Sequence, residues 1–371
     1  MKLRFKKHVA LTLISLMLLS LIGCGKPAST DTITTTEAAV TEAPAASISD
    51  AATTADSTPA DASEEGSDAQ TVYPVTVTDQ AGREVTIEKE PESIVSGYYI
   101  STSLLLALGL KDKVTGIEAK ADKRPIYKLA APEFLELPNV GTAKEFDLET
   151  CASISPELVI LPMKLKDAAQ SLSELDIPVL LVNPESEDQL EQMIELVSTA
   201  TNTKGNADAL LSYIDEKKEM LEKDLSGVDA KSVYLAGNSS LLSTAGPAMY
   251  QSGLIELAGG KNAASEITDT YWAEISYEQL LAWDPSYIIL ASDAEYTPED
   301  VLNDENLKEC TAVKNGDVYA IPGDIEALDS PVPGGILASI WLAGILHPDQ
   351  VSADMYTEEK AAFYETFYGI K

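Results

Sequence analysis

The sequence predicts an α/β protein with two Rossmann-like lobes, each built on a mostly parallel sheet, joined by one long interlobe helix and separated by a ligand cleft. The length of 371 residues suits about two domains. Short apolar strands alternate with helical segments in two blocks, and parallel strands need such helical crossovers. A long amphipathic stretch at residues 203–226, without strand character, separates the two blocks. Domain interfaces of this kind are preferred ligand sites.

The first lobe is predicted over residues 72–202. It opens with a hairpin in which two alternating strands flank a Gly turn at residues 79–82. The later strands are short apolar runs at residues 94–96, 114–117, 158–161 and 179–182. Helices are expected between them, at residues 102–108, 148–153, 172–175 and 189–199.

The connector helix is predicted over residues 203–226 and the second lobe over residues 227–371. From 207 to 225 the connector has apolar residues near helical spacing and neither Gly nor Pro. The second lobe has strands at residues 233–236, 287–290 and 318–321, and helices at residues 249–257, 277–282 and 336–346. Ser330-Pro331 has the pattern of a helix start, with Ser as N-cap and Pro in the first turn.

The N-terminus has the pattern of a lipoprotein signal peptide over residues 1–23. A basic segment precedes an apolar run from Val9 to Ile22, which is too short to span a bilayer comfortably and ends at Gly23-Cys24. Cys24 is therefore predicted to carry the lipid, which anchors the protein to the outside of the cell membrane. An ordinary signal peptide is the alternative. Residues 24–71 contain no aromatic side chain and are rich in Ala, Thr, Ser and acidic residues. They are expected to form a disordered acidic linker.

Composition excludes several classes of function. There are 60 Asp and Glu against 26 Lys and Arg, a net charge of −34, which leaves no basic surface for nucleic acid. Three cysteines do not make a disulfide scaffold, and Cys151 and Cys310 are expected to be free, buried thiols. Only His8 and His347 are histidines, so a metal site made of several imidazoles is excluded. His347 suits the end of an apolar helix, with metal ligation as the alternative.

An enzyme is not expected. The chain has no Gly-x-Ser-x-Gly elbow and no histidine pair of a metal hydrolase. No cofactor is predicted beyond the bound solute itself.

A set of short motifs, in order, carries a family resemblance. They are Val77–Arg83, Asn139–Gly141, Asp147–Glu149, Ser155–Ile160, Gly259–Asn262, Ile275–Leu280, Asp284-Pro285, Trp341–Ala343 and Leu346–Pro348. On these motifs, residues 72–371 resemble the periplasmic-binding domain of ABC importers for iron complexes and cobalamin, the class III solute-binding proteins with a helical backbone. The resemblance implies a non-enzymatic receptor that captures a solute and hands it to a permease with its ATPase. It also implies that Glu149 and Glu278 dock onto permease arginines, the alternative being ordinary solvated carboxylates.

Candidate ligand residues follow the strands of both lobes, because ligands of parallel sheets gather at the carboxyl ends of strands. In the first lobe these are Tyr98, Tyr99, Lys123, Arg124, Met163 and Lys164. In the second lobe they are Asn238, Tyr271, Trp272 and Asp329. The basic residues suit an anionic group and the aromatic residues a flat one. The alternatives are solubilising lysines and aromatic side chains that only pack at the rim.

The predicted ligand is a metal chelate: a ferric siderophore, a corrinoid or haem. Met163, Tyr98 and Tyr99 are possible axial ligands, so haem belongs among the candidates. Two other interpretations stay open, a receptor for a small oxyanion and a surface interaction or sensory lipoprotein that uses the same fold without transport. A monomer is expected.

Overall fold

The computed structural model describes residues 70–371. The predicted signal peptide, Cys24 and the linker up to residue 69 lie outside the described residues. Within residues 70–371, no helix has both the length and the apolar character that crossing a membrane requires.

The first lobe is built on a four-stranded parallel sheet in the order β4-β3-β5-β6. Its β5 strand, Leu158–Pro162, is buried at all five positions, as expected for a strand covered on both faces. The predicted hairpin is confirmed as the antiparallel pair β1 and β2. The elements of this lobe are β1 (Val75–Thr78), β2 (Glu84–Ile87), β3 (Ile94–Ser96), α1 (Tyr99–Ala107), β4 (Val114–Gly116), α2 (Pro125–Ala130), α3 (Leu148–Ser153), β5, α4 (Lys166–Ser173), β6 (Val179–Val182) and α5 (Glu187–Thr201).

The second lobe repeats this plan with a parallel sheet in the order β12-β11-β7-β9. A small antiparallel pair, β8 with β10, lies beside it and was not predicted. The elements are β7 (Lys231–Ala236), β8 (Ser243–Ala245), α7 (Tyr250–Leu257), β9 (Gly260–Asn262), β10 (Trp272–Glu274), α8 (Tyr277–Trp283), β11 (Tyr287–Leu290), α9 (Pro298–Leu302), α10 (Thr311–Asn315), β12 (Val318–Ala320), α11 (Ile336–Leu346) and α12 (Ala353–Tyr368). The α/β prediction of two lobes with parallel sheets is therefore confirmed.

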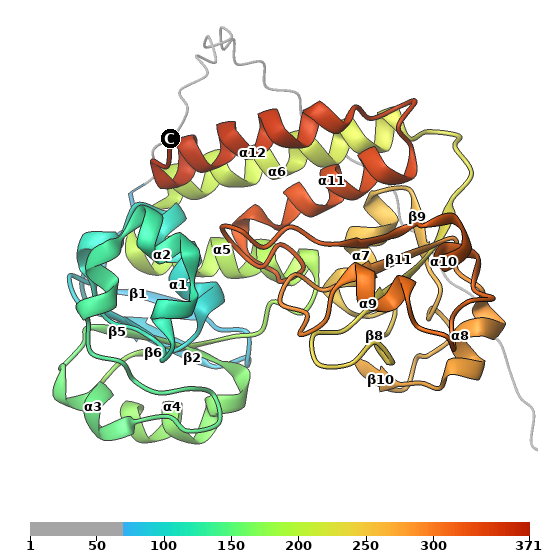
Figure 1. Ribbon diagram of the computed structural model, residues 1–371. Coiled ribbons are helices and arrows are strands. Elements are labelled where there is room, and N and C mark those ends of the chain that lie inside the picture. The colour runs from blue at the N-terminus through green and yellow to red at the C-terminus, as the bar shows by residue number, and fades with distance from the viewer. Residues whose placement is uncertain (1–69) are drawn as a thin grey trace, which may run out of the picture. The chain divides into compact units, whose positions relative to one another are not determined.

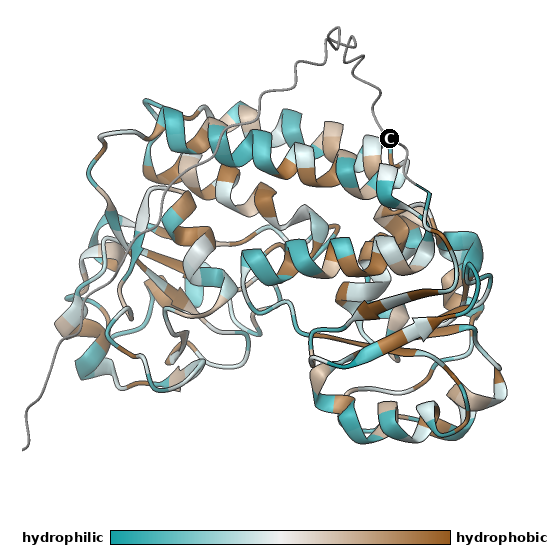
Figure 2. Cartoon of the chain, turned by 180° about the vertical axis from the view of Figure 1, so that it is seen from behind, coloured by the Kyte–Doolittle hydropathy of each residue, from teal (hydrophilic) through white to brown (hydrophobic). Residues whose placement is uncertain are grey.

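The chain leaves the first sheet through α5 and passes to β7 through α6 (Lys204–Asp224), close to the predicted connector. Helix α6 contacts α5, α7 and α11, and α12 runs along it (Figure 1). Lys217 of α6 has only 7% of its surface exposed and pairs at 2.9 Å with Glu359 of α12. Apolar residues concentrate on the strands, and hydrophilic ones on the outward helix faces (Figure 2).

Two further parts of the second lobe differ from the sequence-based expectation. Helix α12 was not predicted, yet it returns to the first lobe and places Tyr368 Oη 2.9 Å from Ser103 Oγ of α1. Ser330 does not cap a helix, because α11 begins at Ile336. A residue that precedes proline is held extended, and Ser330 and Val332 precede Pro331 and Pro333, which delays the helix.

Candidate ligand cleft

A cavity of about 700 Å³ lies where strands of the first sheet end. Its walls come from the loops after β3 and β4 and from the loop at residues 141–146, together with the loop after β11 of the second lobe. The lining residues are Gly97, Tyr98, Tyr99, Glu118, Ala119, Lys120, Lys123, Arg124, Thr142, Ala143, Asp293 and Glu295. The volume lies within the range of about 300–1,000 Å³ that is usual for small-molecule sites.

Arg124 is the central cation of this cavity. Its guanidinium carbon lies 4.0 Å from the centre of the Tyr99 ring, a cation–π contact. Its Nη1 lies 3.7 Å from Oδ2 of Asp293, which belongs to the second lobe. Residues 70–371 contain one other arginine, Arg83. Its guanidinium forms an ion pair of 2.6 Å with the buried carboxylate of Asp79. Arg124 is thus the arginine that the fold leaves facing the cleft.

A buried carboxylate supports the loop that carries Arg124. Glu118 accepts hydrogen bonds of 2.6 Å from the Tyr127 hydroxyl and 2.7 Å from the Thr102 hydroxyl. Burial raises the pKa of Glu118 above its ordinary value, and these two hydrogen bonds oppose the rise. The three residues join α1, the end of β4 and α2, so they hold the basic loop against the first lobe.

The two tyrosines form the aromatic wall of the cavity. Their rings meet edge to face, with centroids 5.4 Å apart and planes at 74°. Burial raises the pKa of Tyr98 and of Tyr99, so both are neutral phenols at physiological pH. Tyr98 can donate a hydrogen bond to an anionic ligand atom, whereas the Tyr99 hydroxyl already donates to Oγ of Ser330.

The structure brings four of the predicted ligand residues together in the cavity wall: Tyr98, Tyr99, Lys123 and Arg124. Met163 and Lys164 follow β5 and are not among its lining residues. Asn238 follows β7, and its backbone carbonyl accepts a 2.8 Å hydrogen bond from the amide of Glu295, at the cavity edge.

The other second-lobe candidates lie in different environments. Tyr271 is 57% exposed and Trp272 is 40% exposed. Trp272 is the first residue of strand β10, and its ring lies against Gly237, just after β7. Asp329 is buried, and its Oδ1 accepts hydrogen bonds from the backbone amide and the hydroxyl of Ser292. Its carboxylate is therefore already engaged inside the second lobe.

Eight lining residues were absent from the predicted site: Gly97, Glu118, Ala119, Lys120, Thr142, Ala143, Asp293 and Glu295. The first four lie beside the predicted residues, in the loops after β3 and β4. A signal for the last two exists in the sequence, because they follow the fully apolar run at residues 288–291 and so stand at a strand end. No comparable signal marks Thr142 and Ala143. A tight turn brings them to the rim, in which the amides of Thr142 and Glu145 donate to one another's carbonyls.

Glu149 and Glu278 occupy equivalent places in the two lobes. Each is exposed and is the second residue of a helix whose preceding residue caps it, Asp147 for α3 and Ser276 for α8. Backbone hydrogen bonding lowers the pKa of Glu278, so this side chain is ionised at neutral pH.

Residues with possible metal or thiol chemistry have structural environments. The Nε2 of His347 lies 3.0 Å from the carbonyl of Gly259, at the end of α11. Cys151 and Cys310 are free and buried, and burial raises the pKa of Cys151 to about 12. Between residues 70 and 371, His, Cys, Asp and Glu form no cluster of three or more that could hold a metal ion.

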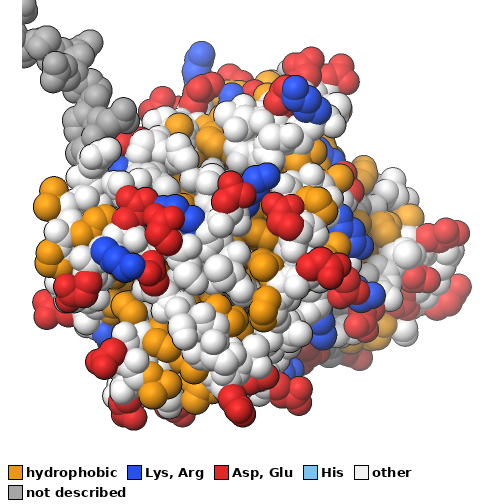
Figure 3. Space-filling model, turned by 90° about the vertical axis from the view of Figure 1, so that its left-hand side faces the viewer, with side chains coloured by type: hydrophobic (Ala, Val, Ile, Leu, Met, Phe, Trp, Pro, Cys, Tyr) orange, Lys and Arg blue, Asp and Glu red, His pale blue; other side chains and the backbone are white. Residues whose placement is uncertain are grey.

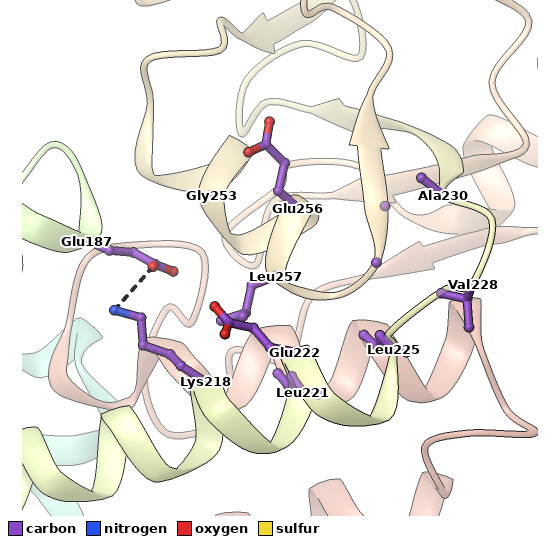
Figure 4. A pocket seen from close by; sticks show the side chains of 12 residues that line it. Glu187, Lys218, Leu221, Glu222, Leu225, Val228, Ala230, Gly253, Glu256 and Leu257 are labelled. Carbon is purple, nitrogen blue, oxygen red and sulfur yellow. Dashed lines mark ion pairs between the residues drawn. The ribbon is translucent and has the colours of Figure 1, made fainter.

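A second cavity of about 500 Å³ lies between α6 and α7. Glu187 and Lys218 point toward one another at its edge, 3.6 Å apart, and Leu221, Leu225 and Leu257 form its apolar side (Figure 4). None of the predicted ligand residues lines it.

Two α/β lobes with parallel sheets, and a basic, tyrosine-rich cavity at the strand ends, are the features of a protein that binds a small solute. The chain belongs to the periplasmic binding protein family, whose family model matches residues 94–325. The predicted family resemblance is thereby confirmed, and the chain is a substrate-binding protein of the ABC-transporter class.

Relatives of known name agree with this assignment. An ABC transporter substrate-binding lipoprotein of Bacillus subtilis, YvrC, is 28% identical over 273 residues, which cover 70% of this chain and 82% of YvrC. The molybdate-binding protein MolA of Haemophilus influenzae is 24% identical over 79% of this chain and 90% of its own. A cobalamin-binding protein of Halobacterium salinarum is 21% identical over 74% of each chain.

Solved structures show the same fold. A periplasmic solute-binding protein from Veillonella parvula has a TM-score of 0.71 and 26% identity, covering 80% of this chain and 93% of that one. MolA with bound molybdate has a TM-score of 0.71 and 22% identity, covering 80% and 98%.

Proposed function

We propose that this protein is the lipid-anchored receptor of an ABC importer, and that it captures an anionic metal chelate in the cleft and delivers it to the permease. The supporting observation is the cavity of about 700 Å³ with Arg124, Lys123 and two tyrosines in its wall. Ferric siderophores, corrinoids and haem are the candidate chelates. They combine bulk, flat or aromatic surface and, in several cases, anionic groups, which this wall suits.

A small oxyanion is the second candidate. MolA, which covers most of this chain, is named for binding molybdate. A single arginine fork with the neighbouring Tyr98 phenol as a donor also suits an oxyanion. The cavity volume favours the larger ligand, because a four-oxygen anion fills only a small part of it.

The first test needs no assumption about the ligand. Protein purified from its native host should absorb visible light if it carries haem, a corrinoid or a coloured ferric siderophore. Purified, ligand-free protein is then titrated with haemin, cyanocobalamin, a ferric siderophore panel and molybdate, and tryptophan fluorescence is recorded.

Paired variants locate the site. Arg124→Ala should weaken binding of an anionic chelate by about tenfold or more, because a charge-assisted hydrogen bond contributes about 1.5–3 kcal/mol. Lys164→Ala removes the same charge from the same lobe outside the cavity wall and should change affinity less than twofold. If the folded protein shows no fluorescence change with any ligand of the panel, and instead retains a protein partner in a pull-down, the result would favour the sensory interpretation.

Delivery and anchoring are tested in cells. Glu149→Ala with Glu278→Ala should abolish uptake of the ligand while leaving its affinity unchanged, since both side chains lie away from the cavity wall. The matched control is Glu222→Ala with Glu256→Ala, which removes two exposed carboxylates elsewhere. Cys24→Ser should release the protein from the membrane fraction. The protein is proposed to act as a monomer and to need no cofactor besides the solute.

A further inference from the structure

We propose that Asp293 is an internal counter-ion for Arg124 in the empty cleft, and that an incoming anion must displace it. Asp293 would thus set which anions the cleft accepts: those with several charges or bidentate oxygens compete well, and weak single anions poorly. This deepens the proposed function and rests on it, because it takes Arg124 to face the ligand.

The geometry places the two groups on opposite lobes. Arg124 precedes α2 of the first lobe, and Asp293 follows β11 of the second. Their charged atoms are 3.7 Å apart, and both side chains are partly exposed, at 30% and 58%. Solvent and a ligand can therefore reach both groups, whereas the partner of Arg83, Asp79, has a fully buried side chain.

The position of Arg124 does not depend on Asp293. The face of the Tyr99 ring lies against the guanidinium. Two residues further on, the Ile126 amide donates a 3.1 Å hydrogen bond to the carbonyl of Ile325. Removing the Asp293 charge should consequently leave Arg124 in place with its outer edge free for an anion.

A carboxylate opposite an arginine is unusual for an anion site unless it is exchangeable. The chain has a net charge of −34, and carboxylates are scattered over the visible face (Figure 3). An arginine without a counter-ion in the cleft would bind many weak anions. A partly exposed ion pair of this kind changes binding by a modest factor, about two- to fivefold. That factor is enough to bias selection without blocking a strong ligand.

Arginine NMR tests the inference directly. The full chain has three arginines, Arg4, Arg83 and Arg124, so the Nε–Hε spectrum is simple, and Arg124→Lys identifies the Arg124 signal. Asp293→Asn is expected to shift that signal in ligand-free protein. Inorganic phosphate, used as a probe anion, should then half-saturate the Arg124 shift at a two- to fivefold lower concentration than in the wild type. The difference should shrink at high salt, because exposed charges are screened.

The matched control is Glu295→Gln. Glu295 lines the same cavity two residues further on, is exposed, and has no ion pair within residues 70–371, so its variant should resemble the wild type. Equal gains in both variants would mean a general charge effect and would overturn the proposal. An unmoved Arg124 signal in Asp293→Asn, or no phosphate response there, would also overturn it. Failure of the proposed function looks different: phosphate still titrates Arg124, but no chelate or molybdate binds.

Discussion

The Tyr99 hydroxyl donates a 2.8 Å hydrogen bond to Oγ of Ser330, a residue 231 positions further along the chain. The bond joins the start of α1, which follows the loop after β3, to the segment that leads into α11. The same ring supports the Arg124 guanidinium. One side chain therefore links the two lobes and supports the arginine of the proposed anion site.

Tyr99→Phe separates these two roles, because it keeps the ring and removes the hydroxyl. We expect a loss of about 1 kcal/mol in the free energy of unfolding, the usual contribution of one hydrogen bond. Ligand affinity should change much less than in Tyr99→Ala, which also removes the face beneath Arg124. Urea unfolding and ligand titration measure the two effects. Tyr98→Phe is the control, since no protein partner is found for its hydroxyl within residues 70–371, and a loss equal to that of Tyr99→Phe would contradict the assignment.

Gly141→Ala should disrupt the cavity rim. Gly141 has φ of +84°, and a β-carbon there would lie 2.1 Å from the carbonyl oxygen of Glu145, a backbone atom that cannot move aside cheaply. We expect destabilisation well above the cost of about 1–2 kcal/mol for a positive φ alone, together with weaker ligand binding through Thr142 and Ala143.

Gly82→Ala is the matched control for this clash. Gly82 has φ of +75° but open space around its missing β-carbon, so its substitution measures the backbone cost by itself. Equal losses for the two variants in thermal or urea unfolding would show that the turn at residues 141–145 adapts.

Glu326 should make stability depend on pH. It is buried between the lobes, where it accepts hydrogen bonds from Ser103 of α1 and, at 3.0 Å, from Tyr364 of α12. Burial raises its pKa to about 7. The folded protein thus holds this proton more tightly than the unfolded chain, so the contribution of Glu326 favours folding at low pH and is lost as the pH rises from about 4.5 to 7.

Glu326→Gln mimics the protonated form and tests that sign. The variant should match the wild type near pH 5 and be more stable above pH 7, by up to about 3 kcal/mol, the equivalent of the pKa shift. Urea unfolding across this pH range measures the difference, with the exposed Glu358→Gln as control. Wild-type and Glu326→Gln curves that stay parallel would contradict the role of Glu326.

The link between α6 and α12 should depend on Glu359. Its carboxylate accepts hydrogen bonds of 2.9 Å from Lys217 and from the Tyr213 hydroxyl. Glu359→Ala leaves the buried Lys217 ammonium with Glu216 as its remaining partner, also at 2.9 Å. We expect a loss of about 2 kcal/mol, below the 3–5 kcal/mol for a fully orphaned charge. Glu358→Ala should cost less than about 0.5 kcal/mol, and equal losses would contradict the link.

Local patterns in the sequence predicted the lobes and part of the cleft. Period-two alternation predicted the β1–β2 hairpin, and apolar runs such as Leu158–Leu161 predicted the parallel strands, because both depend on neighbouring residues. Tyr98 and Tyr99 were found because they follow β3 closely, and Arg124 because it lies in the loop after β4; strand ends meet at one edge of a parallel sheet. The same rule, applied after residue 290, would have found Asp293.

The sequence by itself determined most strands of the two parallel sheets and several of their helices, the acidic character of the chain and the basic loop at residues 120–124. Only the tertiary structure decided that Arg124 faces Asp293, that Asp329 turns inward to Ser292, and that α12 returns to pack against α1 and α6. The physical reason is range. Strand and helix patterns arise from residues a few positions apart, whereas these contacts join segments up to 265 positions apart, and packing of whole elements selects them.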